Sequence, residues 1–317
     1  MNNIYQHFIS NNKQKFKQFY QRIPEKNRKF LKPIFWVWGQ FQKIYLPAFK
    51  FHGKSKLNGI EFVFIYAGSD DIYHNYFAEE FFSPGYKKEF IGYHLFWNIR
   101  NFMRKNFPEC ILIFVEFNIF TNYLFKKQPS FKIPSWLEME IDISLPMNLM
   151  RKLRRSGYLD IQRHIRKYNL NFEVTTSQIQ FENFYYNMHL PYIKKRHLNI
   201  AIIDSYSDFM KICKNSELFI FKKENETAGG MIVEYKNNGV FFRRLGIENG
   251  NEAYLKAGII GAAYYFTIIE MQKKGYKKIN IGGTRAFLNN GLTKYKLGLS
   301  AYIFPHLYVP CEYTHPG

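Results

Sequence analysis

Apolar and polar positions alternate along residues 57–145 in a way that predicts strands and helices in turn. Strands are predicted at 60–66, 111–115 and 136–143, and helices at about 70–82 and 90–106. The first two strands are short apolar runs rich in β-forming residues, which is typical of buried strands. The third alternates apolar and charged side chains, which indicates that one of its faces is exposed.

A basic stretch at 147–168 has helical periodicity. Leucine and isoleucine recur there at four-residue steps and form one apolar stripe, and Gly157 is expected to bend or divide the helix. Arg163, Arg166 and Lys167 are spaced so that they share a face. Two interpretations stay open for this face: a solvated charged surface, or a surface that binds phosphate or carboxylate.

The remaining residues repeat the alternation of strand and helix. Strands are predicted at 172–175, 217–222, 228–235, 240–245 and 277–281, and helices at 180–195, 207–215, 254–274 and 292–297. The sequence Asn237-Asn238-Gly239 is a strong signal for a hairpin turn. This order of elements predicts an α/β fold.

Composition and charge limit the classes of protein and partner. The chain has 317 residues, 46 % of them hydrophobic, which suits one large domain or two compact lobes with real cores. Its net charge is +20. A charge of this sign favours anionic partners, such as the phosphates of a cofactor, tRNA or an acidic membrane surface, without choosing among them.

The first 56 residues form a basic, aromatic extension with twelve basic residues and one acidic residue. Prolines interrupt it, and the run 35–41 is very aromatic with lysines following it. One interpretation is a helix that docks on the rest of the protein and exposes its basic face. The other is peripheral contact with an anionic membrane through residues 1–56.

The three cysteines, Cys110, Cys213 and Cys311, are too far apart for a zinc site or a disulfide framework. No stretch approaches the length of a membrane span, and no signal peptide is evident at the N-terminus. We therefore expect no metal and a cytoplasmic protein, with a peripheral position at the inner face of the membrane as the second expectation.

A run of small residues lies at 256–263. Gly-containing loops that open a helix can direct backbone N–H groups and the positive end of the helix dipole at an anion such as pyrophosphate. The expected cofactor-binding residues are Lys256, Gly258, Gly261 and Ala262. Close packing of helices through glycine and alanine would explain the same run.

Three segments carry a resemblance to a known family. The sequences NMHLPYIKKRHLNIAIIDSY (187–206), YLKAGIIGAAYYFTI (254–268) and GGTRAFLNNGLTKYK (282–296) are similar to the Fem-like branch of the GNAT acyltransferase superfamily. The resemblance implies a GNAT-like mixed, twisted sheet flanked by helices, in two lobes of which the C-terminal one is better formed. It divides the chain into an extension at 1–56, a degenerate lobe at 57–145 and an acyltransferase lobe at 146–317.

The resemblance also implies roles for several residues. Tyr295 lies where the family's proton donor to the leaving group often sits, although a packed helix tyrosine is the plainer interpretation. Gly258 and Gly261 are separated by two residues, which departs from the family's usual pyrophosphate loop. This spacing leaves acyl-CoA, another acyl carrier and aminoacyl-tRNA open as the donor substrate, with no bound cofactor.

Basic residues elsewhere are candidates for binding the substrate. Arg285 follows two glycines at a strand end, and Arg243 and Lys296 lie in the same C-terminal lobe. Arg196 could anchor a carboxylate or phosphate, and His197 could also act as a general base because its ordinary pKa lies near neutral pH. A surface cluster at a helix end is the alternative for these last two.

The first hypothesis is direct transfer of an acyl group from acyl-CoA or an acyl carrier to an amine or sugar-amine acceptor, in cell-envelope or polysaccharide synthesis. Such a reaction depends on orientation and on backbone N–H groups at a strand bulge, which we expect at Leu245-Gly246. The alternatives are an aminoacyl-tRNA-dependent Fem-type transferase and a non-enzymatic protein that binds anions or a membrane surface with an inactive lobe.

Overall fold

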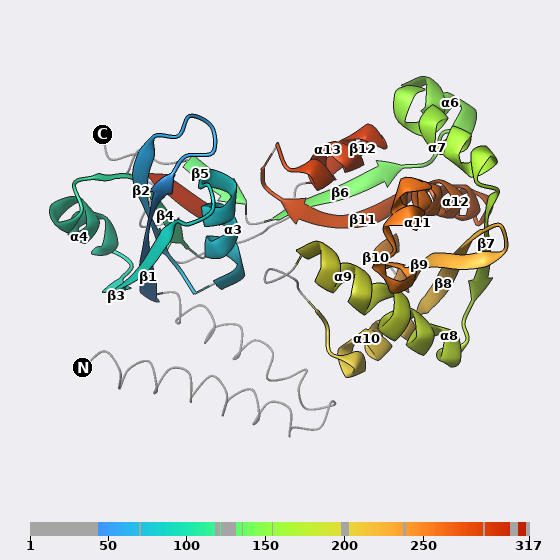
Figure 1. Cartoon of the computed structure of the whole chain (residues 1–317), viewed down its shortest axis with the longest axis horizontal. Coiled ribbons are helices and arrows are strands. Elements are labelled where there is room, and N and C mark those ends of the chain that lie inside the picture. The colour runs from blue at the N-terminus through green and yellow to red at the C-terminus, as the bar shows by residue number, and fades with distance from the viewer. Residues whose placement is uncertain are drawn as a thin grey trace. The chain divides into compact units, whose positions relative to one another are not determined.

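The computed structural model describes residues 44–314 except 70, 118–120, 122–130, 135, 154, 198–202, 237–238, 288 and 305–309. The chain forms two compact units (Figure 1). The first consists of Met1–Ser135 together with Tyr308–Gly317, and the second of Trp136–Leu307. Each unit has its own sheet and core, and each is described by itself.

The first unit is built on a six-stranded sheet in the order β3-β1-β2-β4-β13-β5. Its elements are β1 (Tyr45–Lys54), β2 (Glu61–Ala67), α3 (Asp71–Phe81), β3 (Lys87–Leu95), α4 (Ile99–Asn106), β4 (Cys110–Glu116), β5 (Phe131–Pro134) and β13 (Pro310–Thr314). Only β2 and β4 pair in parallel among the strands of this sheet. The last described strand of the chain, β13, lies between β4 and β5 and so returns to the first unit.

Two predictions for the first unit are wrong. Residues 45–54, assigned to the extension, form β1, whose pairing with β2 and β3 places Leu46, Ala48 and Phe51 in the core. Residues 87–95, most of which were expected to start a helix, form the edge strand β3. Both segments are strands because they pair with neighbouring strands. Their local composition, which includes several basic residues, does not predict this pairing. The aromatic run 35–41 lies outside the described residues.

The second unit has a seven-stranded mixed sheet in the order β12-β6-β11-β10-β9-β8-β7. Its strands are β6 (Trp136–Asp142), β7 (Leu170–Thr175), β8 (Ser216–Lys223), β9 (Glu226–Lys236), β10 (Gly239–Ile247), β11 (Lys278–Arg285) and β12 (Ala301–Phe304). β7 to β10 are antiparallel, and β11 lies parallel to β10 and antiparallel to β6.

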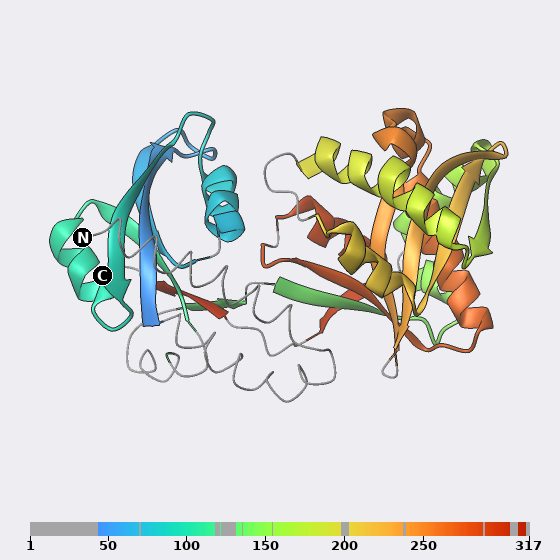
Figure 2. The same ribbon diagram turned by 90° about the horizontal axis from the view of Figure 1, so that it is seen from below.

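Helices cover both faces of this sheet. They are α6 (Met147–Leu153), α7 (Arg155–Lys167), α8 (Gln178–Asn183), the π-helix η2 (Phe184–His189), α9 (Leu190–His197), α10 (Tyr206–Cys213), α11 (Glu252–Lys256), α12 (Ile259–Lys273) and α13 (Gly291–Gly298). Successive residues of β8 enter different clusters: Phe219 joins the core beneath α12, and Leu218 joins the core beneath η2 and α10. This alternation fits a sheet that is buried on both sides (Figure 2).

The structure confirms the predicted α/β fold with mixed sheets flanked by helices. It assigns β6 to the second sheet, because β6 pairs with β11 and β12, whereas the sequence placed residues 57–145 in one lobe. The predicted helix 254–274 is broken between α11 and α12 at Gly258, whose φ of 85° is a left-handed conformation. Within the described residues, no helix is both long and apolar enough to span a bilayer.

Candidate functional site

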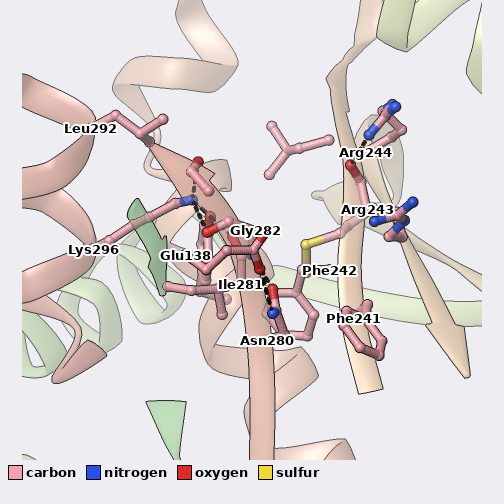
Figure 3. Close-up of a pocket in the computed structure, with 14 residues that line it drawn as sticks. Glu138, Phe241, Phe242, Arg243, Arg244, Asn280, Ile281, Gly282, Leu292 and Lys296 are labelled. Carbon is pink, nitrogen blue, oxygen red and sulfur yellow. Dashed lines mark hydrogen bonds between the residues drawn. The ribbon is translucent and has the colours of Figure 1, made fainter. Parts of the chain in front are cut away.

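The strands β10 and β11 separate soon after they meet. Their parallel pairing consists of Val240 with Ile279 and Phe241 with Asn280, and no pairing follows although both strands continue. A cavity of about 410 Å³ lies where they diverge (Figure 3). Its lining comes from β6, β9, β10, β11, α12 and α13, all in the second unit. The gap between the two strands is therefore the candidate site.

A bulge in β10 borders this cavity. The register between β10 and β9 shifts between Phe242 and Arg244, so that Arg243 is the extra residue. The predicted position at Leu245-Gly246 is wrong, because both residues keep regular pairing with β9. Gly246 has a different reason to be glycine: a Cβ atom there would lie 2.7 Å from the backbone nitrogen of His189 on η2.

A buried lysine supports the β11 side of the gap. The Nζ atom of Lys296 donates hydrogen bonds to the carbonyl oxygens of Ile281, Gly282 and Gly283 at 2.8, 3.0 and 3.1 Å. β11 is itself irregular here, with a register shift against β6 and a φ of 75° at Gly282. Burial lowers the pKa of Lys296 to about 8, and the negative charge of Glu138 opposes this effect.

Side chains also satisfy carbonyl groups on the β10 side. His189 donates from Nδ1 to the carbonyl oxygen of Leu245 at 2.9 Å, since a carbonyl oxygen can only accept. Burial lowers the pKa of His189, which favours its neutral form. Arg244 donates from Nη1 to the carbonyl oxygen of Arg243 at 2.7 Å. Side chains thus donate hydrogen bonds to carbonyl groups on both strands. These carbonyl groups therefore do not need hydrogen bonds between β10 and β11.

Charged side chains of both signs border the cavity, where Glu138 accepts a 2.8 Å hydrogen bond from Asn280. On β10, two neighbouring arginines, Arg243 and Arg244, line the cavity, whereas their acidic partners Glu234 and Asp204 do not. Figure 3 shows these arginines on one strand and Glu138, Asn280 and Lys296 across the gap. The site can therefore contact both an anionic and a cationic group of a ligand.

The structure brings only some of the predicted site residues to this cavity. Arg243 and Lys296 line it, and their substrate-binding role stays a prediction. Arg196 is exposed on α9, with its guanidinium 5.8 Å from the ring of Tyr192. Arg285 ends β11, is 9 % exposed, and stacks over Trp136 at 5.2 Å. The side chain of His197, at the end of α9, lies outside the described part of the chain.

Tyr295 lies on α13 beside the cavity lining. Its ring is 5.8 Å from that of Tyr264, which does line the cavity. The Tyr295 hydroxyl is buried and has no hydrogen-bond partner among the described residues. Burial raises the pKa of Tyr295 well above its ordinary value. Its role as a proton donor stays a prediction.

The first turn of α12 is covered by α7. A Cβ atom at Gly258 would lie 3.0 Å from the Cβ of His164, and one at Gly261 would lie 2.8 Å from the Cγ1 of Ile161. Ala262 is fully buried, and Lys256 is exposed at the end of α11. Close helix packing thus accounts for the small residues, and their cofactor-binding role stays a prediction.

Several residues of the site escaped the sequence analysis. Glu138 and Asn280 are far apart in the chain and meet only because β6 pairs with β11. His189 reaches β10 from a π-helix that local patterns do not predict. Two adjacent arginines in an otherwise apolar strand were the available signal for Arg244. In the described residues, no group of three or more His, Cys, Asp and Glu could hold a metal ion.

No protein-family model matches the sequence, and a search of curated proteins gives no match. Solved structures do resemble it, at 7–12 % identity. FemX covers 81 % of this chain and 82 % of its own at 10 % identity, with a TM-score of 0.45. L-PGS from Bacillus licheniformis covers 83 % of each chain at 12 % identity, with a TM-score of 0.42.

A tandem GNAT protein from the clavulanic acid biosynthesis pathway covers 83 % of this chain and 81 % of its own, at 9 % identity and a TM-score of 0.34. At such identities the likeness concerns the arrangement of helices and strands alone.

Proposed function

We propose that this protein is an acyl-group transferase that joins an activated acyl or aminoacyl group to an amine in the gap between β10 and β11. The observation that supports this most is the gap itself: a cavity between two parallel strands, bordered by a bulge and supported by side chains. A reaction between two bound substrates needs such a preformed space, because orientation supplies much of its rate.

The chemistry asked of the site is limited. The amine nitrogen attacks the carbonyl carbon, a C–N bond forms, and the bond to the thiol or ribose oxygen of the donor breaks. We assign the oxyanion that forms between these steps to backbone N–H groups at the bulge around Arg243. Glu138 is the one carboxylate among the cavity-lining residues, and we assign it the proton that leaves the amine. Glu138 then passes that proton to the departing sulfur or oxygen, directly or through Tyr295, so that the products are an amide and a neutral thiol or hydroxyl.

The donor that we favour is an aminoacyl-tRNA. A CoA pyrophosphate would need the first turn of α12, where His164 and Ile161 already pack. The exposed side of α7 carries Arg163, Arg166 and Lys167, which suit a phosphodiester backbone. Acyl-CoA and acyl carriers are the second candidates. A cytoplasmic position and peripheral membrane contact through the basic residues that precede β1 are part of the proposal.

A transfer assay on the full chain tests the proposal. The protein is incubated with acetyl-CoA or with mixed aminoacyl-tRNAs, each with a lysine-containing peptide or an amino sugar as acceptor, and amide products are detected by mass spectrometry. Amide formed from aminoacyl-tRNA supports the favoured donor, and amide formed from acetyl-CoA supports the second. If no donor gives product with either acceptor, the proposal fails and a non-enzymatic anion-binding protein becomes the better account.

A further inference from the structure

Two consecutive arginines of β10 border one cavity. Five consecutive residues of this strand, Phe241 to Leu245, line the gap, and the bulge at Arg243 lies in the middle of them. The two arginines differ in how their guanidinium groups are occupied, and that difference separates a structural role from a binding role.

Arg244 is occupied by the protein itself. Its Nε donates to Oδ2 of Asp204 at 2.6 Å, its Nη2 contacts the same oxygen, and its Nη1 donates to the carbonyl oxygen of Arg243. All three nitrogens of the guanidinium thus have a partner. Arg244 holds the bulge in shape and ties it to the segment that precedes α10.

Arg243 has one ionic partner among the described residues. Its Nε lies 2.9 Å from Oε2 of Glu234, an ion pair that lacks hydrogen-bond geometry, and its two terminal amino groups form no hydrogen bond or ion pair with the residues that the structure describes. Glu234 is 8 % exposed and also lies 3.2 Å from Nζ of Lys236. One carboxylate therefore serves two cations, Arg243 in the cavity lining and Lys236 outside it, so this cluster of three side chains has a net positive charge.

The surroundings favour an anionic ligand at this point. The ion pair with Glu234 uses only the Nε side of the guanidinium. The terminal amino groups of an arginine form the fork that carboxylates and phosphates bind with two parallel hydrogen bonds. Phe241, Phe242 and Leu245 lie beside Arg243 in the cavity wall. Such apolar neighbours lower the local dielectric constant and strengthen a charge-assisted hydrogen bond.

We propose that Arg243 is an oxyanion-binding residue that receives a carboxylate or phosphate group of the ligand. The claim that Arg243 binds an anion does not depend on the proposed function. The claim that this anion belongs to a substrate of acyl transfer does rest on it. The inference narrows the substrate class, because one of the two reactants must carry a negatively charged oxygen group close to the reacting carbonyl. Lys236 shares the carboxylate of Arg243 but does not line the cavity, so it supplies a matched control.

The test is a calorimetric or NMR titration of the full chain with sodium phosphate and sodium acetate at constant ionic strength. We expect saturable binding of one of the two anions to the wild type, and the preferred anion identifies the group. Arg243→Gln should weaken this binding about tenfold. Lys236→Gln also removes one positive charge beside Glu234, but it should weaken the binding less than about threefold. Arg243→Lys should give an intermediate loss, because it keeps the charge and loses the fork.

Two results would overturn the inference. One is equal weakening by Arg243→Gln and Lys236→Gln, which would mean that the general positive field binds the anion. The other is the absence of saturable binding to the wild type. If Arg243→Gln does not fold, Arg243→Lys takes its place in the comparison. A loss of anion affinity larger than that of Lys236→Gln then supports the inference, and an equal loss overturns it. No acyl donor is present, so failure here is distinct from failure of the transfer assay.

Discussion

Replacing Lys296 by methionine tests whether a buried ammonium group supports the β11 side of the gap. Methionine is unbranched and of similar length, so the substitution removes the ammonium group and little else. Lys296 is 3 % exposed, and its ammonium group donates to three carbonyl oxygens of β11. A charge in this position gives the stability of the protein a distinct dependence on pH, which the methionine variant should lack.

The magnitude follows from the lowered pKa. Below about pH 8 the lysine is charged in both the folded and the unfolded chain. Between about pH 8 and 10.5 the folded chain has released a proton that the unfolded chain still binds, so the free energy of unfolding rises with pH. The difference between 10.5 and about 8 corresponds to about 3 kcal/mol.

The assay is urea denaturation of the full chain in buffers from below about pH 8 to above about pH 10. Tyrosines and cysteines titrate in the same range, so the quantity to follow is the wild-type free energy minus that of Lys296→Met. It should rise by about 3 kcal/mol. Lys294→Met, an exposed position on the same helix, is the control and should show a far smaller change. If the difference in free energy of unfolding between the wild type and Lys296→Met changes by less than about 0.5 kcal/mol across this pH range, the claim that Lys296 is a buried ammonium group is refuted.

Three further substitutions test particular contacts. Gly246→Ala should lower the free energy of unfolding by about 1–3 kcal/mol, because its Cβ would meet the backbone of η2. Gly291→Ala is the control and should not lower it, because a Cβ there meets nothing within 4 Å. Chemical denaturation measures both variants. Tyr295→Phe removes a buried hydroxyl that has no hydrogen-bond partner in the described part of the chain, so stability should not fall. Turnover should fall more than binding if Tyr295 protonates the leaving group, and unchanged turnover would exclude it from the mechanism. Arg244→Ala should cost about 1–3 kcal/mol, because it leaves Asp204 without its cation, and a melting temperature equal to that of the wild type would contradict the assigned structural role.

Local patterns in the sequence predicted most of the elements in the second unit. The hairpin signal at Asn237-Asn238-Gly239 predicted the antiparallel pairing of β9 with β10, and that pairing is found. The predicted helices and strands around it have the right type, although the long helix is divided at Gly258. These elements have strong periodicity of their own, so the local sequence was enough.

The rest depended on contacts between distant segments. β1 is a strand because it pairs with β2 and β3, and β3 because it pairs with β1, and the composition of these segments does not predict either pairing. Arg243 and Lys296 were chosen as candidates because they are basic residues in the C-terminal lobe, and both line the cavity. Glu138 could not be linked to Asn280 beforehand, since only the register of β6 against β11 brings them together.

The central claim is that transfer takes place in the gap between β10 and β11. The most direct test fills that gap. Leu292 lines the cavity and is 47 % exposed, so Leu292→Trp can add bulk there with little cost to the core. Ile179→Trp, at an exposed position on α8, is the control. The account predicts at least about a tenfold loss of amide formation in Leu292→Trp at an unchanged melting temperature, with full activity in Ile179→Trp. Full activity in Leu292→Trp would contradict the assignment of the site.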